Sequence, residues 1–146
     1  MVRGMYSKEE IYFKQLNVCD NFEVRDCQLT NAHIETTNAK CQVISSKMID
    51  TIEGVSLEGQ VLTGKKLVIV GSISIRIFVH FPRKAQCGYW IQRELPFSTF
   101  IIVPCDVCDE EEIHIKNTIE DVTTVVITRG RIFVNAILLL EYQDEY

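Results

Sequence analysis

The segment Leu67-Val-Ile-Val-Gly-Ser-Ile-Ser-Ile-Arg-Ile-Phe-Val-His-Phe81 decides the fold, because apolar and polar side chains alternate along it. In an extended chain one face carries Ile73, Ile75, Ile77, Val79 and Phe81, and the other carries Ser72, Ser74, Arg76 and His80. A period of two residues indicates a β-strand with one face against a core. Pro82 ends the pattern, because proline has no backbone N–H to donate to a sheet.

Most of the remaining chain also has strand-like patterns. They occur at residues 41–50, 84–93, 96–104, 112–116, 122–127 and 131–142. Glycine at 54, 59 and 64 favours turns, and Gly130 indicates either a hairpin or one long strand with a bulge. No long helical pattern connects these segments, so a parallel sheet is not expected. The sequence predicts an all-β, mainly antiparallel fold, either a β-sandwich or an open barrel.

The N-terminal end has a different pattern. Ser7-Lys-Glu-Glu10 resembles a helix-capping box, which predicts a short helix continuing through Ile11, Tyr12 and Phe13. The chain has 146 residues, which is the length of one domain. We therefore expect an N-terminal arm at residues 1–22 and a single β-rich domain at residues 23–146.

Charge and hydropathy restrict the classes of partner. The net charge is −5, with a pI near 5.2, which argues against nucleic-acid binding through a basic face. The longest apolar run, Ala136–Leu140, is far too short for a membrane-spanning helix. The N-terminus has no apolar segment of the kind found in secretory signals, so we expect synthesis on the cytosolic side without a signal peptide.

The cysteines are the most reactive residues that the sequence offers. Six are present, at positions 19, 27, 41, 87, 105 and 108. The acidic residues around Cys105-Asp-Val-Cys108 disfavour the thiolate that a redox enzyme needs. Zinc would need two further ligands; Cys87 and His114 are available, but a second CxxC motif is not. The remaining alternatives are loop thiols, buried small hydrophobic residues, and disulfides within or between subunits.

Catalytic and cofactor motifs are missing from the sequence. The stretch Gly59 to Lys66 lacks the ending of a phosphate-binding loop, and Ser98 lies in an apolar run without a nucleophile elbow. The acidic residues 110–112, 144 and 145 lack the spacing of an EF-hand. Tyr89 and Trp90 suggest either a sugar-stacking platform or an aromatic pair in the core, and the core is favoured. We predict neither an enzyme nor a bound cofactor.

Several motifs in a fixed order resemble one known family. They are Phe13-Lys-Gln-Leu16, Met48-Ile-Asp-Thr-Ile-Glu-Gly54, Glu58-Gly-Gln-Val-Leu-Thr-Gly-Lys-Lys-Leu-Val-Ile-Val-Gly71, Pro96-Phe-Ser-Thr-Phe-Ile101 and Ile119-Glu-Asp-Val122. Together they resemble the SPOCS domain, which occurs in spore-coat and spore-envelope proteins of clostridia and related endospore-forming Firmicutes. The resemblance covers roughly residues 11–142, so we do not expect the peptidoglycan-binding LysM domain that some members append.

The resemblance implies a structural protein of the spore surface, in the coat or exosporium, made in the mother-cell cytoplasm. Its expected partners are further copies of itself and other spore-envelope proteins, with neither nucleic acid nor a membrane span. We expect it to self-assemble into an ordered layer or filament. The candidate inter-subunit disulfide residues are Cys19, Cys27, Cys41, Cys105 and Cys108. The alternative is a monomeric module that recruits another spore-envelope protein or binds carbohydrate.

Overall fold

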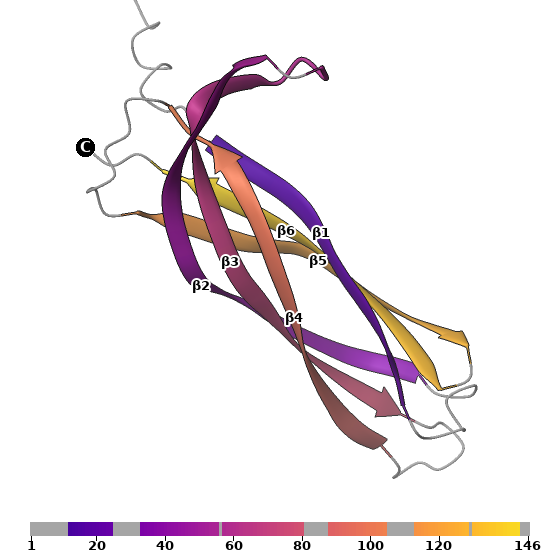
Figure 1. Ribbon diagram of the computed structural model, residues 1–146. Coiled ribbons are helices and arrows are strands. Elements are labelled where there is room, and N and C mark those ends of the chain that lie inside the picture. The colour runs from indigo at the N-terminus through magenta and orange to yellow at the C-terminus, as the bar shows by residue number, and fades with distance from the viewer. Residues whose placement is uncertain are drawn as a thin grey trace, which may run out of the picture.

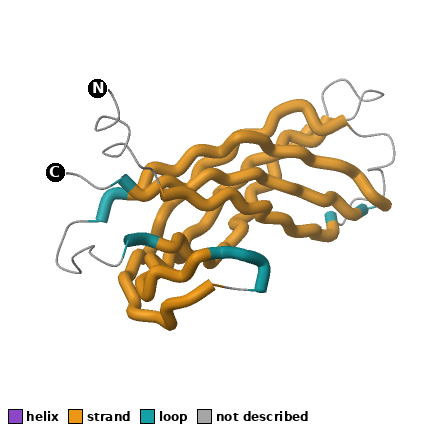
Figure 2. The backbone as a smooth tube through the Cα atoms, turned by 90° about the horizontal axis from the view of Figure 1, so that it is seen from above, coloured by secondary structure: helices purple, strands orange, loops and turns teal. Residues whose placement is uncertain are grey.

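The part of the chain that can be described is built from β-strands. The computed structural model describes residues 12–24, 33–55, 57–80, 88–104, 113–128 and 130–143. Within these ranges the strands are β1 (Tyr12–Glu23), β2 (His33–Val55), β3 (Val61–His80), β4 (Gly88–Ile102), β5 (Ile115–Thr128) and β6 (Arg131–Tyr142). No helix occurs in the described ranges, and strands form nearly all of the backbone traced there (Figure 2). The predicted all-β class is confirmed.

The strands form two antiparallel sheets that pack face to face (Figure 1). Sheet A has the order β1-β6-β5, and sheet B has the order β2-β3-β4. Across the sandwich β1 lies near β4, and β2 lies near β5. Ladder pairing stays within each sheet, so the architecture is a sandwich, the first of the two predicted alternatives.

The core lies between the two central strands, β3 and β6. Their buried side chains alternate, and each of these side chains is at most 2% exposed: Leu67, Ile69, Ile73, Ile75, Ile77 and Val79 on β3, and Ile132, Val134, Ala136, Leu138, Leu140 and Tyr142 on β6. The predicted inward face of residues 73–79 is confirmed. A central strand has a neighbouring strand on each side, so its inward side chains are covered from solvent by those strands as well as by the opposite sheet.

Gly71 lets two parts of the inner face of sheet B approach closely. A Cβ atom at this position would lie 2.5 Å from Cζ of Phe97 and 2.7 Å from the carbonyl oxygen of Gln42. Val43 of β2 pairs with Gly71, and the register of β2 shifts directly after it, between Val43 and Ser45. Only glycine leaves room there for both the aromatic ring and the bulged backbone.

The N-terminal strand β1 belongs to the sandwich. It pairs with β6 from Tyr12 to Glu23, in register with Tyr142 to Arg131. Tyr12 and Phe13, which we expected to continue a helix, are strand residues, so that part of the prediction is wrong. The tertiary ladder with β6 overrides the weak local signal. The capping-box residues 7–10 lie outside the described residues.

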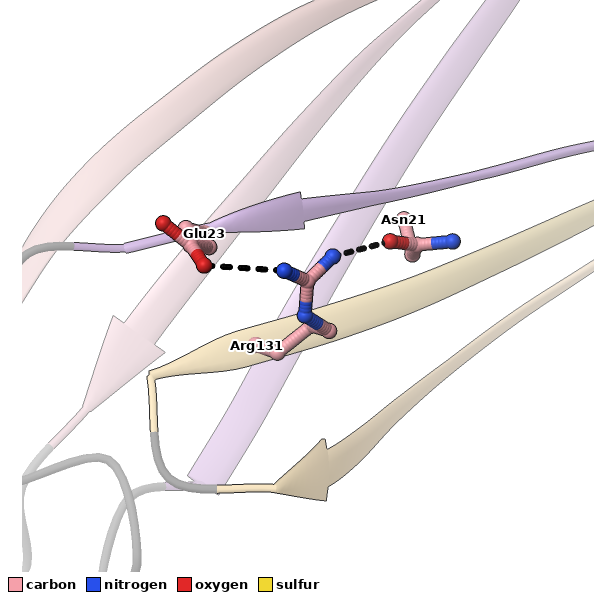
Figure 3. A network of polar contacts seen from close by, with 3 residues as sticks. All are labelled: Asn21, Glu23 and Arg131. Atoms are coloured by element: carbon pink, nitrogen blue, oxygen red, sulfur yellow. Dashed lines mark hydrogen bonds and ion pairs between the residues drawn. The ribbon is translucent and has the colours of Figure 1, made fainter.

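A tight turn joins β5 to β6, so the hairpin alternative holds for this region. Gly130 has a φ of 75°, a left-handed conformation that favours glycine. Its carbonyl oxygen accepts a hydrogen bond of 2.5 Å from the backbone N–H of Val24, just after β1. The guanidinium of Arg131 contacts both Glu23 and Asn21, with 2.8 Å between Nη2 and Oε1 of Glu23 (Figure 3). These contacts fasten the end of β1 to the β5–β6 hairpin.

Two isoleucines provide a matched test of this core. Replacing Ile75, which is 1% exposed, with alanine is expected to lower the free energy of unfolding by about 2–5 kcal/mol, through lost burial and a residual cavity. Replacing Ile52, which is 81% exposed, is expected to change it by no more than about 0.5 kcal/mol. Urea denaturation under reducing conditions measures both values. Equal losses at the two positions would contradict the assignment of the core.

Candidate functional site

Two candidate cross-linking cysteines are described, and they occupy different environments. Cys19 is exposed on β1, an edge strand of sheet A, and pairs with Asn135 on the outer face. Cys41 on β2 pairs with Ile73 and packs partly buried against the core. Burial raises the pKa of the Cys41 thiol, which reduces its thiolate fraction. Of the two described candidates, Cys19 is therefore the more accessible to a partner molecule.

The other candidate cysteines lie outside the described residues. They are Cys27, Cys105 and Cys108, together with the possible zinc ligand Cys87. Within the described ranges no group of three or more His, Cys, Asp or Glu side chains could hold a metal ion. The disulfide hypothesis therefore remains a prediction for these positions, and so does the weaker zinc alternative.

Trp90 lies at the surface, so the favoured prediction of a core aromatic pair is wrong for this residue. Its side chain is 50% exposed on the outer face of sheet B. The guanidinium carbon of Arg76 lies 4.8 Å from the ring centroid of Trp90, and the ring of Phe78 lies 5.0 Å away at a tilt of 50°. Phe78 packs over Gly88, where an added Cβ would come within 2.4 Å of its ring. We call Arg76, Phe78 and Trp90 the aromatic patch.

The β2–β3 hairpin extends past the rest of sheet B. Strand β3 pairs with β4 only from Lys66 onward, whereas its pairing with β2 continues to Val55 and Val61 (Figure 1). The side chain of Thr63 donates a hydrogen bond to the carbonyl oxygen of Val103, and the Val103 N–H bonds to Lys65 at 3.3 Å. These contacts hold the base of the hairpin, and the part beyond is a two-stranded ribbon. Such ribbons are marginally stable alone.

The end of this ribbon is apolar and exposed. We call residues 52–61 the hairpin tip; its large apolar side chains are Ile52 (81% exposed), Val55 (68%), Leu57 (109%) and Val61 (62%). Carboxylates are the only charged groups between residues 48 and 64: Asp50, Glu53 and Glu58. The tip therefore combines apolar surface with negative charge. The sequence analysis did not identify this exposed apolar tip. Apolar residues that lie among turn glycines and outside any alternating pattern could have indicated it.

A small pocket lies where β1, β4 and the hairpin meet. It is lined by Tyr12, Phe13, Lys14, Gln60, Phe100, Ile101 and Ile102, and its volume is about 220 Å³. The ammonium groups of Lys14 and Lys66 lie 5.0 and 4.2 Å from the centroid of the Phe100 ring. We call this site the two-lysine pocket. Phe13 also borders a shallower groove of about 490 Å³ on sheet A, which it forms with Gln15, Leu139 and Glu141.

A protein-family model described as "SipL, SPOCS domain" matches residues 32–128, more than half of the chain. The match begins just before β2 and ends with β5, so it includes both the hairpin tip and the aromatic patch. No curated protein and no solved structure matches the chain. In the described residues we find no helix with the length and hydropathy needed to cross a membrane.

Thiol reactivity tests the environments of the two described cysteines. In the folded, reduced protein near neutral pH, Cys19 is expected to react with an alkylating agent faster than Cys41. Cys41 is partly buried and its pKa is raised, so less thiolate is present and access is restricted. Raising the pH is expected to accelerate labelling of Cys41 as its thiolate fraction grows. Mass spectrometry of peptides resolves the two sites, and denatured protein, in which the rates converge, is the control. Faster labelling of Cys41 in the folded state would contradict this arrangement.

Proposed function

Because the chain belongs to the SipL/SPOCS domain family, we propose that it is a structural protein of the bacterial spore surface that self-assembles into an ordered layer or filament. Membership of the family indicates a spore-coat or spore-envelope protein. Family membership does not by itself indicate self-assembly, and it does not distinguish the coat from the exosporium. The observation that carries assembly is the hairpin tip, whose four large apolar side chains are each more than 60% exposed. Exposed apolar side chains gathered in one place mark an interaction site.

The edges of the sandwich support the same proposal. Strands β1 and β5 border sheet A, and β2 and β4 border sheet B. An edge strand presents unpaired backbone groups, which a neighbouring molecule can use for pairing. On β2, Ile44 is 64% exposed beside the bulge between Val43 and Ser45. A protein that functions by assembly needs such surfaces, whereas catalysis needs converging reactive groups; we propose that this protein is not an enzyme.

Cysteines can lock the contacts after assembly. Cys19 is the best placed of the described thiols, since it is exposed on an edge strand. Cys27, Cys105 and Cys108 are the further candidates, and Cys41 is the least suitable because it packs against the core. Formation of one disulfide joins two sulfur atoms and releases two protons and two electrons. Dioxygen can accept these electrons once the protein leaves the reducing mother-cell cytoplasm, where we expect it to be synthesised.

Assembly and cross-linking can be tested separately with purified full-length protein. Native mass measurement and electron microscopy are expected to show high-mass ordered assemblies. Oxidised assemblies are expected to release more protein when reductant is added, and Cys19→Ser is expected to make them easier to extract. Cys41→Ser, at the least suitable position, is the comparison variant. A stable monomer would overturn the assembly proposal, whereas assemblies that dissolve equally with and without reductant would overturn cross-linking alone.

The aromatic patch favours carbohydrate binding as a second candidate function. The indole of Trp90 is half exposed and is held by Arg76 and Phe78, so a sugar ring can stack on it at little cost in side-chain entropy. The outer face of sheet B also presents amide side chains beside the patch, because Asn38 and Gln92 both pair with Arg76. Amides can donate to and accept from hydroxyl groups.

Trp90 is the only tryptophan in the chain, so its fluorescence reports directly on the aromatic patch. The emission is expected to be shifted to the red relative to a buried indole, and to be accessible to a soluble quencher. Oligosaccharides of N-acetylglucosamine are expected to shift the emission and reduce quenching. Calorimetry with Trp90→Ala is expected to show loss of binding, with Trp90→Phe retaining part of it. An unchanged signal in saturating sugar would overturn this second candidate and leave assembly untouched.

A further inference from the structure

We infer that the hairpin tip of one molecule docks in the two-lysine pocket of a second copy of this chain. The inference rests on the proposed self-assembly and names its contact surfaces. It joins two features that the sandwich itself leaves without a structural role: an exposed apolar tip on β2–β3, and a pocket between β1 and β4 in which lysine side chains lie against an aromatic ring.

Apolar side chains of the pocket can pack against those of the hairpin tip. The walls of the pocket include Phe13, Phe100 and Ile102, and its volume of about 220 Å³ suits one or two apolar side chains rather than a large ligand. Leu57 stands at the turn of the hairpin and is 109% exposed, so it does not fill the pocket of its own molecule. Insertion of Leu57 from a second molecule would remove apolar area from water on both surfaces.

The charges of the pocket and of the hairpin tip are opposite in sign. Two ammonium groups, from Lys14 and Lys66, converge on the ring of Phe100 at 5.0 and 4.2 Å. Among the described residues, no carboxylate forms an ion pair with either of them. The charged groups of the incoming hairpin between residues 48 and 64 are Asp50, Glu53 and Glu58. Carboxylates brought beside the lysines would relieve the repulsion between the ammonium groups.

The hairpin tip and the two-lysine pocket lie close to each other in the molecule. Gln60 of the hairpin lines the pocket, so the tip and the pocket lie at the same end of the molecule. Two molecules that meet at this end can each present a tip to the other. The marginal stability of a free two-stranded ribbon gives a further reason for a partner, because docking would bury part of the apolar surface that the ribbon exposes in the monomer.

The experiment uses full-length protein under reducing conditions, so that disulfides do not contribute, and follows association by analytical ultracentrifugation. The tip variant is Glu53→Lys with Glu58→Lys, and the pocket variant is Lys14→Glu with Lys66→Glu. Each alone is expected to weaken association at least about tenfold, because like charges then meet across the contact. An equimolar mixture is expected to recover association, because every tip then finds a pocket of opposite charge. Wild-type association is expected to fall as salt increases.

Control variants separate docking from general effects. Lys40→Glu with Lys116→Glu makes the same change in net charge as the pocket variant, at exposed positions on β2 and β5 that do not line the pocket, and should leave association unchanged. Leu57→Ser should weaken association without changing charge, whereas Ile127→Ser, at a 47% exposed position on β5, should not. Circular dichroism and urea denaturation confirm that each variant folds.

The outcomes distinguish this inference from the proposal on which it rests. If the wild-type protein stays monomeric at all concentrations, self-assembly fails and docking fails with it. If the wild type associates and the tip and pocket variants associate equally well, docking alone fails. If the control lysine variant is as weak as the pocket variant, net charge explains the effect and docking is again overturned. Recovery only in the mixture of tip and pocket variants supports the inference.

Discussion

The burial of β3 against β6 is the interaction on which the rest of this structure depends. Each strand is central in its sheet, and each places a continuous row of aliphatic side chains in the interface. Neither sheet alone could bury its apolar face, because a three-stranded sheet has an inner surface that only the other sheet covers. The outer strands add side chains at the margins of this core, such as Val18 on β1 and Ile91 on β4. Packing of these two rows against each other also determines which face of each sheet points outward.

The β2–β3 hairpin of sheet B extends beyond the core, and the extension carries the exposed apolar tip. Strand β3 is paired on both sides along Lys66–His80, but beyond Lys66 toward the turn it is paired only with β2. Four large apolar side chains of that extension stay exposed: Ile52, Val55, Leu57 and Val61. An isolated domain gains nothing in stability from this arrangement, whereas a subunit of an assembly gains a contact. The core strand and the exposed apolar tip are therefore parts of the same hairpin.

Two places in the described residues present cations and aromatic rings at the surface. Other polar contacts, such as those of Arg131 with Glu23 and Asn21, join strands at the surface and contribute little to the net free energy of folding. The aromatic patch and the two-lysine pocket each place cations beside aromatic rings that a partner can reach. Such sites suit recognition, because weakly paired charges and partly exposed rings gain most when a second surface removes them from water.

The sequence by itself determined the all-β class and the inward face of β3, because alternation with a period of two depends only on neighbouring residues. It also carried enough ordered motifs to identify the family. It could not place Trp90, because the same aromatic residue suits a core or a surface until its strand is paired and its face is known. It misassigned Tyr12 and Phe13, because pairing of β1 with β6 joins residues more than one hundred positions apart. Only the tertiary structure decided where sheet B outgrows the sandwich, and so which apolar side chains remain exposed, because that depends on the lengths and registers of three strands together.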